Sequence, residues 1–140
     1  MQGYRGKMKI VHASGKRKSA VARATLRQGN GLMRVNSVPI GLVHPKMSRL
    51  KLIEPLILAG DVASKVNIDV DVIGGGISSQ AEASRLAIAK ALVNFTKSDK
   101  LKEVFLSYDR NLLVADVRFK ETAKPNRHGQ ARSKVQKSYR

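Results

Sequence analysis

The stretch of residues 66–95 constrains the fold most, because three consecutive glycines separate a strand-like segment from a helix-like one. Apolar and polar residues alternate from Val66 to Val72, which is the period of a half-buried strand. Residues 74–76 are glycines, which permit backbone angles that other residues avoid. Apolar residues then recur every three or four positions as far as Phe95. The pattern predicts a strand, a tight turn and a helix with one buried face.

The start of this helix carries two signals. Ser79 precedes Glu82 by three residues, the spacing of a capping box, so we expect these side chains to cap the first turn. A glycine loop that leads into a helix is also a potential anion site, because free amides and the helix dipole face the same gap. Neither the P-loop string nor the full dinucleotide fingerprint is present. An architectural turn is the favoured interpretation, and phosphate binding is the alternative.

The charge is uneven along the chain, and its sum is +17. Residues 1–53 hold twelve Lys and Arg and no acidic residue, residues 54–117 hold seven basic and nine acidic residues, and residues 118–140 hold eight basic residues and one acidic residue. Self-repulsion on this scale needs a polyanionic partner. Nucleic acid, bound through its phosphates, is the favoured candidate. An anionic membrane surface or an acidic protein is the alternative.

The composition excludes several protein classes. A chain of 140 residues suits one domain, and the absence of Cys excludes disulfides and thiolate metal sites. No apolar run approaches the roughly 20 residues of a membrane span, so we expect a soluble, cytoplasmic protein. His12, His44 and His128 lie in separate segments without metal-ligand spacing. We therefore expect no catalytic residues, no metal and no cofactor.

Three acidic residues suggest structural ion pairs rather than acid–base catalysis. Asp69 and Asp71 share the outward face of the predicted strand, and Asp109 stands directly before Arg110.

The three residues Lys16, Arg17 and Lys18 form a basic triplet between Gly15 and Ser19. This triplet is either a turn that reaches a partner's phosphates or a solvated hairpin tip.

The remaining elements follow from apolar period and turn residues. We expect strands at residues 8–13, 19–27, 32–36 and 112–117, with the second and third forming an antiparallel hairpin around the turn at residues 28–31 and a bend at residues 36–39. A helix should start near Pro45, break at Pro55 and stop at Gly60. A short helix should span residues 100–105 after caps at Ser98 and Asp99.

This layout predicts an α+β fold, a single domain with a mixed β-sheet and helices packed mostly on one face. The globular part should span residues 1–117, including a short basic N-terminal segment. Residues 118–140 lack an apolar period and should form an extended basic tail that is disordered until it meets a partner. Fully extended, this tail reaches about 75 Å at about 3.3 Å per residue.

Six strings occur in one order along the chain, from about Lys9 to Arg140: GKRKSAVARA, GNGLMRVN, LIEPLILAG, the GGG loop with QAEASRLAIAKAL, YDRNLLVADVR and QKSYR. Together they resemble the small-subunit ribosomal protein nine family of the archaeal and eukaryotic kind. The chain departs from the family pattern at Ser79, where Gly is frequent, and at residues 116–119, where Asp-Pro-Arg-Arg is expected and Asp-Val-Arg-Phe stands.

The resemblance implies the β-α-β fold shared with the second domain of ribosomal protein five and with certain phosphate-binding kinases. It implies a non-enzymatic, structural component of the small-subunit head that binds the 3′ major domain of the ribosomal RNA and lies beside other head proteins. The residues we expect to contact ribosomal RNA are Lys16, Arg17, Lys18, Arg23, Lys46, Arg49, Arg127, Arg132 and Lys134. The tail is expected to reach the peptidyl-site tRNA through Lys137, Ser138, Tyr139 and Arg140.

Two other functions remain open at this point. The glycine loop could belong to a small phosphotransferase, although the sequence offers no clear nucleotide pocket or metal-binding carboxylate beside it. The basic ends could also belong to an architectural nucleic-acid chaperone outside the ribosome, which would bind unrelated duplexes equally well.

Overall fold

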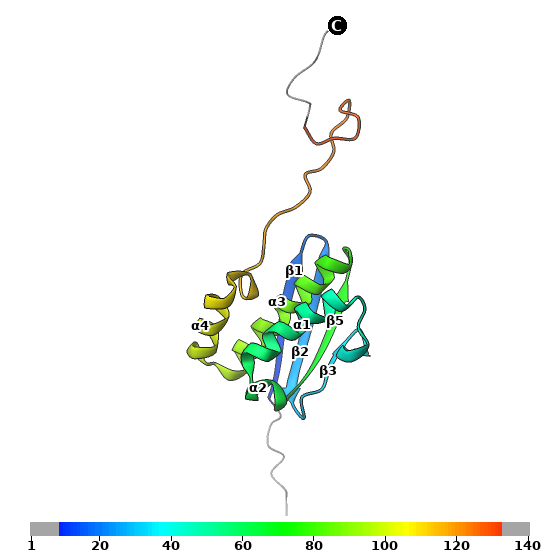
Figure 1. Ribbon diagram of the computed structural model, residues 1–140. Helices are drawn as coiled ribbons and strands as arrows, with labels where there is room; N and C mark the ends of the chain where they lie inside the picture. The colour runs from blue at the N-terminus through cyan, green and yellow to red at the C-terminus, as the bar shows by residue number, and fades with distance from the viewer. Residues whose placement is uncertain (1–8, 133–140) are drawn as a thin grey trace, which may run out of the picture.

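The computed structural model describes residues 9–132 as one α+β domain followed by a long tail segment (Figure 1). The strands are β1 Ile10–Arg17, β2 Ala20–Gln28, β3 Met33–Val35, β4 Val38–Pro39 and β5 Val66–Ile73. The helices are α1 Lys46–Ala59, α2 Asp61–Ser64, α3 Ile77–Thr96 and α4 Asp99–Tyr108, with 3-10 turns η1 Ile40–Leu42 and η2 Arg110–Leu112. The mixed sheet and the single domain confirm the predicted fold class.

The sheet order is β1-β2-β5-β3-β4, and β3 runs parallel to β5 while the other pairs are antiparallel. The predicted hairpin between β2 and β3 is therefore wrong. The much longer β5 pairs with β2 from Val21 to Gln28 and buries more apolar surface there than three-residue β3 could. The β2–β3 loop crosses the start of β5, where Asn67 Oδ1 accepts bonds from the backbone N–H groups of Asn30 (2.9 Å) and Leu32 (3.1 Å).

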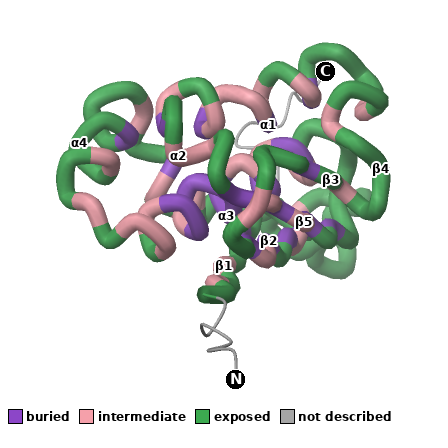
Figure 2. The backbone as a smooth tube through the Cα atoms, turned by 90° about the horizontal axis from the view of Figure 1, so that it is seen from below, coloured by how far each residue is buried: buried purple, intermediate pink, exposed green. Residues whose placement is uncertain are grey.

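Helix α3 lies across β1 and β2, and small residues permit its close approach. Figure 2 shows α3 as a long buried stretch above the strands. Ala20, Ala22 and Ala24 of β2 are at most 1% exposed. A Cβ on Gly15 would lie 2.2 Å from the carbonyl oxygen of Ala83, so only glycine lets the α3 backbone rest on β1. The alternating β5 residues complete the core, as the sequence predicts.

Helix α1 continues through Pro55, so the predicted break is wrong. The proline ring is buried, and this packing offsets the lost backbone hydrogen bond. The predicted end at Gly60 is confirmed: its φ is 57°, and its N–H donates to the carbonyls of Leu56 and Ile57. The predicted bend after β3 is also confirmed, with positive φ at Asn36 and Ser37.

The capping box at the start of α3 is not formed. The helix begins at Ile77, with Gly76 as its N-cap, so Ser79 already lies in the first turn. Glu82 is bound elsewhere, by Arg17 and Lys51. By contrast, Ser98 caps α4 as predicted, its Oγ accepting a bond from the Leu101 N–H at 3.4 Å.

The predicted strand at residues 112–117 is wrong, and β1 is longer than predicted. Asp109 accepts a bond from the Asn111 N–H (2.9 Å) and starts the turn η2, after which the chain runs without strand pairing. Because β1 extends to Arg17, the basic triplet is split between the strand and a tight turn at Lys18, whose φ is 51°. Among the described residues, none of the helices is long and apolar enough to cross a membrane.

Candidate nucleic-acid interface

One end of the domain gathers the segments that the charge pattern singles out. The β1–β2 turn lies beside the glycine loop, since Arg17 pairs with Ala20 and Val21 pairs with Ile73 in the sheet. Lys51 of α1 pairs with Glu82 of α3, and Glu54 of α1 pairs with Arg85 of α3. The two helices therefore run in the same direction, and both N-termini lie at this end. The tail segment leaves the domain here, at the top of Figure 1. We call this the loop end.

A hollow at the loop end is suited to an anion. Its volume is about 690 Å³, and it is lined by Lys18, Ser19, Gly75, Gly76, Ser79, Arg118, Phe119 and Lys120. Within the described part of the chain, no side chain caps Gly76, so the first amides of the 20-residue helix α3 face this region together with the positive end of its dipole. Three cationic side chains and these amides favour phosphate.

The glycines hold this hollow against the β1–β2 turn. Gly74 and Gly75 have φ of 76° and 65°, which side-chain-bearing residues rarely adopt. A Cβ on Gly74 would lie 2.5 Å from the carbonyl oxygen of Ser19. The loop is therefore an architectural turn, as favoured from the sequence, and it also forms part of the hollow.

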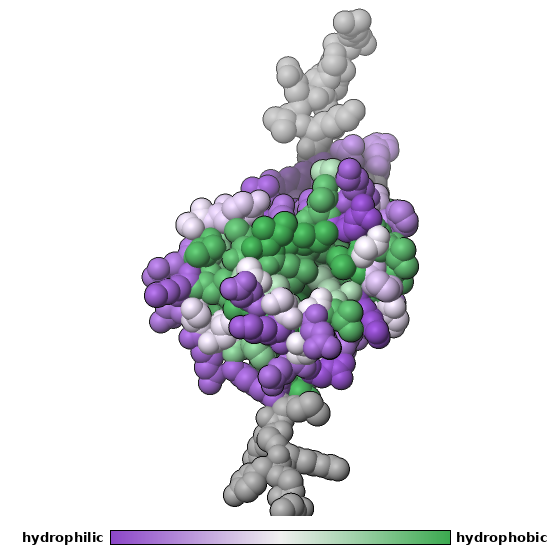
Figure 3. Space-filling view, turned by 60° about the horizontal axis from the view of Figure 1, so that its bottom comes forward, coloured by the Kyte–Doolittle hydropathy of each residue, from purple (hydrophilic) through white to green (hydrophobic). Residues whose placement is uncertain are grey.

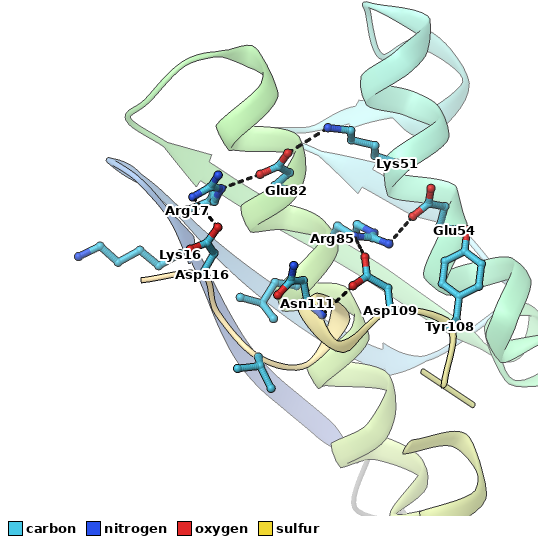
Figure 4. A pocket seen from close by; sticks show the side chains of 12 residues that line it. Lys16, Arg17, Lys51, Glu54, Glu82, Arg85, Tyr108, Asp109, Asn111 and Asp116 are labelled. Atoms are coloured by element: carbon cyan, nitrogen blue, oxygen red, sulfur yellow. Dashed lines mark hydrogen bonds and ion pairs between the residues drawn. The ribbon is translucent and has the colours of Figure 1, made fainter. Parts of the chain in front are cut away.

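Beside the hollow lies a cluster of ion pairs around Arg17 (Figure 4). Arg17 Nε lies 2.7 Å from Glu82 Oε2, and Arg17 Nη1 lies 3.1 Å from Asp116 Oδ2. Lys51 Nζ reaches the other oxygen of Glu82 at 3.1 Å. The cluster thus joins β1, α1, α3 and the start of the tail.

Burial and hydrogen bonding act in opposite directions on the pKa of Glu82. Burial of the carboxyl acts to raise its pKa, but the hydrogen bonds from Arg17 and Lys51 outweigh burial and lower it below its ordinary value. The hydrogen bond to Glu82 raises the pKa of Arg17 despite partial desolvation. Both groups therefore stay ionised at neutral pH.

The same cluster extends to Arg85, whose side chain is only 14% exposed. Its guanidinium contacts Glu54 Oε2 at 2.6 Å and Asp109 Oδ2 at 3.1 Å. Asp109 is therefore paired with Arg85 rather than with the adjacent Arg110. The lining of this roughly 500 Å³ pocket contains four basic and four acidic side chains. This balance suits a structural clamp more than an anion site.

The predicted ribosomal RNA contacts fall into four places. Lys16, Arg17 and Lys18 lie at the loop end, and Lys46 begins α1 at the same end. Arg23 lies on the open face of the sheet, in register with Asp71. Arg49 donates to the carbonyl of Gly41 (2.9 Å), Arg132 pairs with Glu121 (2.9 Å), and Arg127 lies in a turn of the tail segment.

Five predicted residues lie outside the described range: Lys134, Lys137, Ser138, Tyr139 and Arg140. The sequence interpretation missed Arg118, Phe119 and Lys120, which line the hollow. Their position at the end of the YDRNLLVADVR string and at the start of the basic run could have indicated them. The salt bridge expected for Asp69 is confirmed by its pairing with Arg27 at 2.5 Å.

The face opposite the tail carries a group of exposed apolar side chains (Figure 3). Figure 3, which brings the end opposite the tail forward, shows an apolar area across the middle of that face, ringed by hydrophilic side chains. Ile57 of α1 and Val104 of α4 are among the large apolar residues that remain exposed outside the loop end. An apolar area offers no cation or hydrogen-bond donor to a phosphate. The cationic hollow at the loop end is therefore the better nucleic-acid interface.

The sequence pattern of the family described as ribosomal protein S9/S16 matches residues 15–140 of this chain. The chain belongs to the ribosomal protein S9 family. The match begins in β1 and covers the domain and the tail together. It confirms the resemblance seen in the six sequence strings.

Curated relatives support the same assignment. The small ribosomal subunit protein uS9 of Methanococcus maripaludis strain C7 is 52% identical over 134 residues, which covers 95% of this chain and 100% of the relative. The uS9 protein of Methanococcus vannielii is 50% identical over 134 residues, with the same coverage. That of Methanothrix thermoacetophila is 48% identical over 133 residues, or 95% of this chain.

Membership of the ribosomal protein S9 family makes this chain a structural, non-enzymatic component of the small ribosomal subunit. It agrees with the expected role in translation and with the cytoplasmic location of ribosomes. The phosphotransferase and the non-ribosomal chaperone considered above are thereby set aside. Over residues 9–132, no group of three or more His, Asp or Glu is placed to hold a metal ion.

Proposed function

We propose that this S9 family protein binds the ribosomal RNA of the small-subunit head through its loop end, and that its tail reaches the peptidyl-site tRNA. The observation that carries the proposal is the hollow of Lys18, Arg118 and Lys120 beside the N-terminus of α3. The tail leaves from the same end, and its residues Arg118 and Lys120 form part of the cationic surface of the hollow. RNA phosphates supply the charge that this surface lacks.

Phosphate and shape recognition should dominate over base reading. Aromatic residues make up only 4% of the chain, which limits stacking on unpaired bases. Phe119 is the aromatic residue in the hollow, and Lys16 Nζ already lies 5.0 Å from its ring centre. The RNA-facing set we propose is the predicted one with Arg118 and Lys120 added and without Arg17.

Arg17 has a different place in this proposal from that of its neighbours. Its guanidinium is shared between Glu82 and Asp116, so its charge is largely compensated within the protein. Lys16 and Lys18 are exposed on either side of it. We propose that Arg17 supports RNA binding by holding Asp116 in place. Residues 116–117, directly before the tail, are the tail root. Lys16 and Lys18 then contact phosphates.

The tail proposal rests on charge and reach. Residues 118–140 carry eight basic residues and one acidic residue, and those described up to residue 132 contain no helix or strand. The proposed tRNA contacts are Lys137, Ser138, Tyr139 and Arg140. The guanidinium of Arg140 would bind a phosphate bidentately. The subunit position beside the 3′ major domain and other head proteins belongs to the same proposal.

The test compares RNAs at one salt concentration, because affinity depends steeply on salt. Full-length protein is titrated with a fragment of the 3′ major domain and with unrelated structured RNA of equal length. A strong preference for the head fragment is expected. Equal affinities would overturn the proposal, because binding would then depend on phosphate charge alone.

The tail is tested separately in reconstituted subunits. Deleting Lys137 to Arg140 should leave assembly intact and weaken tRNA retention in the peptidyl site. Failure of assembly, or tRNA retention equal to that of the full-length protein, would contradict the tail proposal while leaving the RNA contact of the domain standing.

A further inference from the structure

A second pocket lies between the β3–β4 hairpin, η1 and the helices α1 and α3, and it shares no lining residue with the hollow. Its volume is about 350 Å³, near the lower limit for pockets that take a small organic group. It is lined by Val35, Asn36, Val38, Leu42, Val43, His44, Ser48, Leu52, Val72, Ile77, Gln80, Ala81 and Ser84. None of these is Lys, Arg, Asp or Glu, although Lys and Arg number 27 in the chain.

The outer part of this pocket exposes large apolar side chains. Leu42 is 64% exposed, Ile77 is 63% exposed and Val38 is 41% exposed. They come from three separate elements, yet they line one cavity. Burying this surface against an apolar group is favourable, because it removes the group and the pocket wall from water.

The inner part holds an unsatisfied hydroxyl. Ser84 is 1% exposed, and its Oγ has no hydrogen-bond partner among the described residues. Buried hydroxyls in folded proteins are nearly always hydrogen-bonded. The amide of Asn36, another polar group of the lining, bonds the N–H and the carbonyl of Val72 rather than Ser84. The pocket therefore offers apolar walls and one free polar partner.

We propose that this pocket receives a large apolar side chain with one hydrogen-bonding group, such as tyrosine, from a neighbouring protein of the small subunit. The apolar part fits the exposed rim, and the polar tip pairs with Ser84. An RNA backbone is disfavoured here, because the uncharged lining offers no cation to a phosphate. The inference rests on the proposed neighbourhood of other subunit proteins, and it assigns them a specific contact.

The experiment places a photoreactive benzoylphenylalanine at position 42 and, as a control, at position 32. Both positions are leucines in exposed segments, with 64% and 56% exposure, but only Leu42 lines this pocket. Assembled small subunits are irradiated, and the crosslinked partners are identified by mass spectrometry. We expect position 42, and not position 32, to capture one subunit protein at a large apolar residue. Capture of ribosomal RNA, capture of this chain's own residues, or no capture from position 42 would overturn the proposal.

A second measurement separates this contact from RNA binding. Leu42→Gln should weaken retention of the captured protein about tenfold in salt-washed subunits, as loss of an interface anchor does. Leu32→Gln should leave that retention unchanged. Both variants should bind the head RNA fragment like the wild type, so failure of RNA binding by all three proteins would count against the proposed function alone. Equal retention of the captured protein in the two variants would overturn the pocket proposal.

Discussion

Arg17 and Asp116 tie the end of the first strand to the root of the tail, with Arg17 Nη1 3.1 Å from Asp116 Oδ2. The same guanidinium holds Glu82 on α3, so one arginine fixes the direction in which the tail leaves the domain. This ion pair restrains the chain directly before Arg118 and Lys120, which line the hollow.

Replacing Asp116 with Asn should release the tail root without unfolding the domain. Trypsin should then cut after Arg118 and Lys120 about threefold to fivefold faster, the range set by loss of one partly exposed ion pair. Glu121→Gln is the matched control, since Glu121 pairs with Lys124 and Arg132 inside the tail itself. Equal cleavage rates in wild type and Asp116→Asn would contradict a restraining role.

The Glu82 carboxylate should make stability depend on acid pH. Its pKa in the folded protein is lowered below its ordinary value of 4.5, because hydrogen bonds from Arg17 and Lys51 outweigh the burial that acts to raise it. Its stabilisation is therefore fully present above pH 4.5 and is lost as the pH falls through the lowered folded value.

Glu82→Gln should accordingly reduce the free energy of unfolding at pH 7 by about 1–2 kcal/mol, as expected for charge-assisted bonds at a partly exposed site. The difference from wild type should shrink as the pH is lowered below 4.5, when urea denaturation is followed across pH. Glu103→Gln, exposed on α4 and outside the cluster, serves as the control. If the free energy of unfolding of Glu82→Gln stays below that of wild type by the same amount down to the lowest pH, the Glu82 carboxylate is not the source of the difference.

Gly15→Ala should destabilise the domain by about 2–3 kcal/mol, because overpacking forces α3 away from β1. The added methyl would lie 2.2 Å from the Ala83 carbonyl and 2.8 Å from the Ala87 nitrogen. Gly41→Ala is the control, since nothing lies within 4 Å of the equivalent methyl. Urea midpoints measure both, and equal midpoints would refute the close helix–strand contact.

Neutralising the hollow should change the salt dependence of RNA binding. The double variant Lys18→Gln with Lys120→Gln removes two proposed phosphate contacts, so the slope of log affinity against log salt should fall by about 1.5–2. Lys65→Gln with Lys102→Gln removes the same charge at exposed positions away from the loop end. If the slope of log affinity against log salt falls by the same amount in both double variants, net charge rather than the hollow governs RNA binding.

Local patterns predicted the parts of the fold that depend on neighbours in sequence. The alternation of apolar and polar residues in β5, the apolar face of α3 and the Ser98 cap each depend on residues close together in the sequence. The structure contains all three. The place of β3 beside β5 depends on residues about 35 positions apart, which no local period encodes. The continuation of α1 through Pro55 likewise depends on burial of its ring by the rest of the domain.

The candidate site divides in the same way. Charge runs indicated Lys16 and Lys18, but the partners of Arg17 and Arg85 come from four distant segments and were not foreseen. Glu82 illustrates the cause, since its spacing from Ser79 fits a cap while two cations at greater distance in sequence compete for it more strongly. The ion pairs of Glu82 with Arg17 and Lys51, and not a local cap with Ser79, determine where the Glu82 side chain lies.

The absence of Cys allows the central claim to be tested from single positions. Ser19→Cys at the loop end and Ser64→Cys at the opposite end of β5 each carry a tethered iron chelate that generates hydroxyl radicals, in reconstituted small subunits. We predict strong, clustered cleavage of the 3′ major domain from position 19 and weak or no cleavage from position 64. Stronger cleavage from position 64, or equal cleavage from both, would show that the loop end is not the RNA-binding surface.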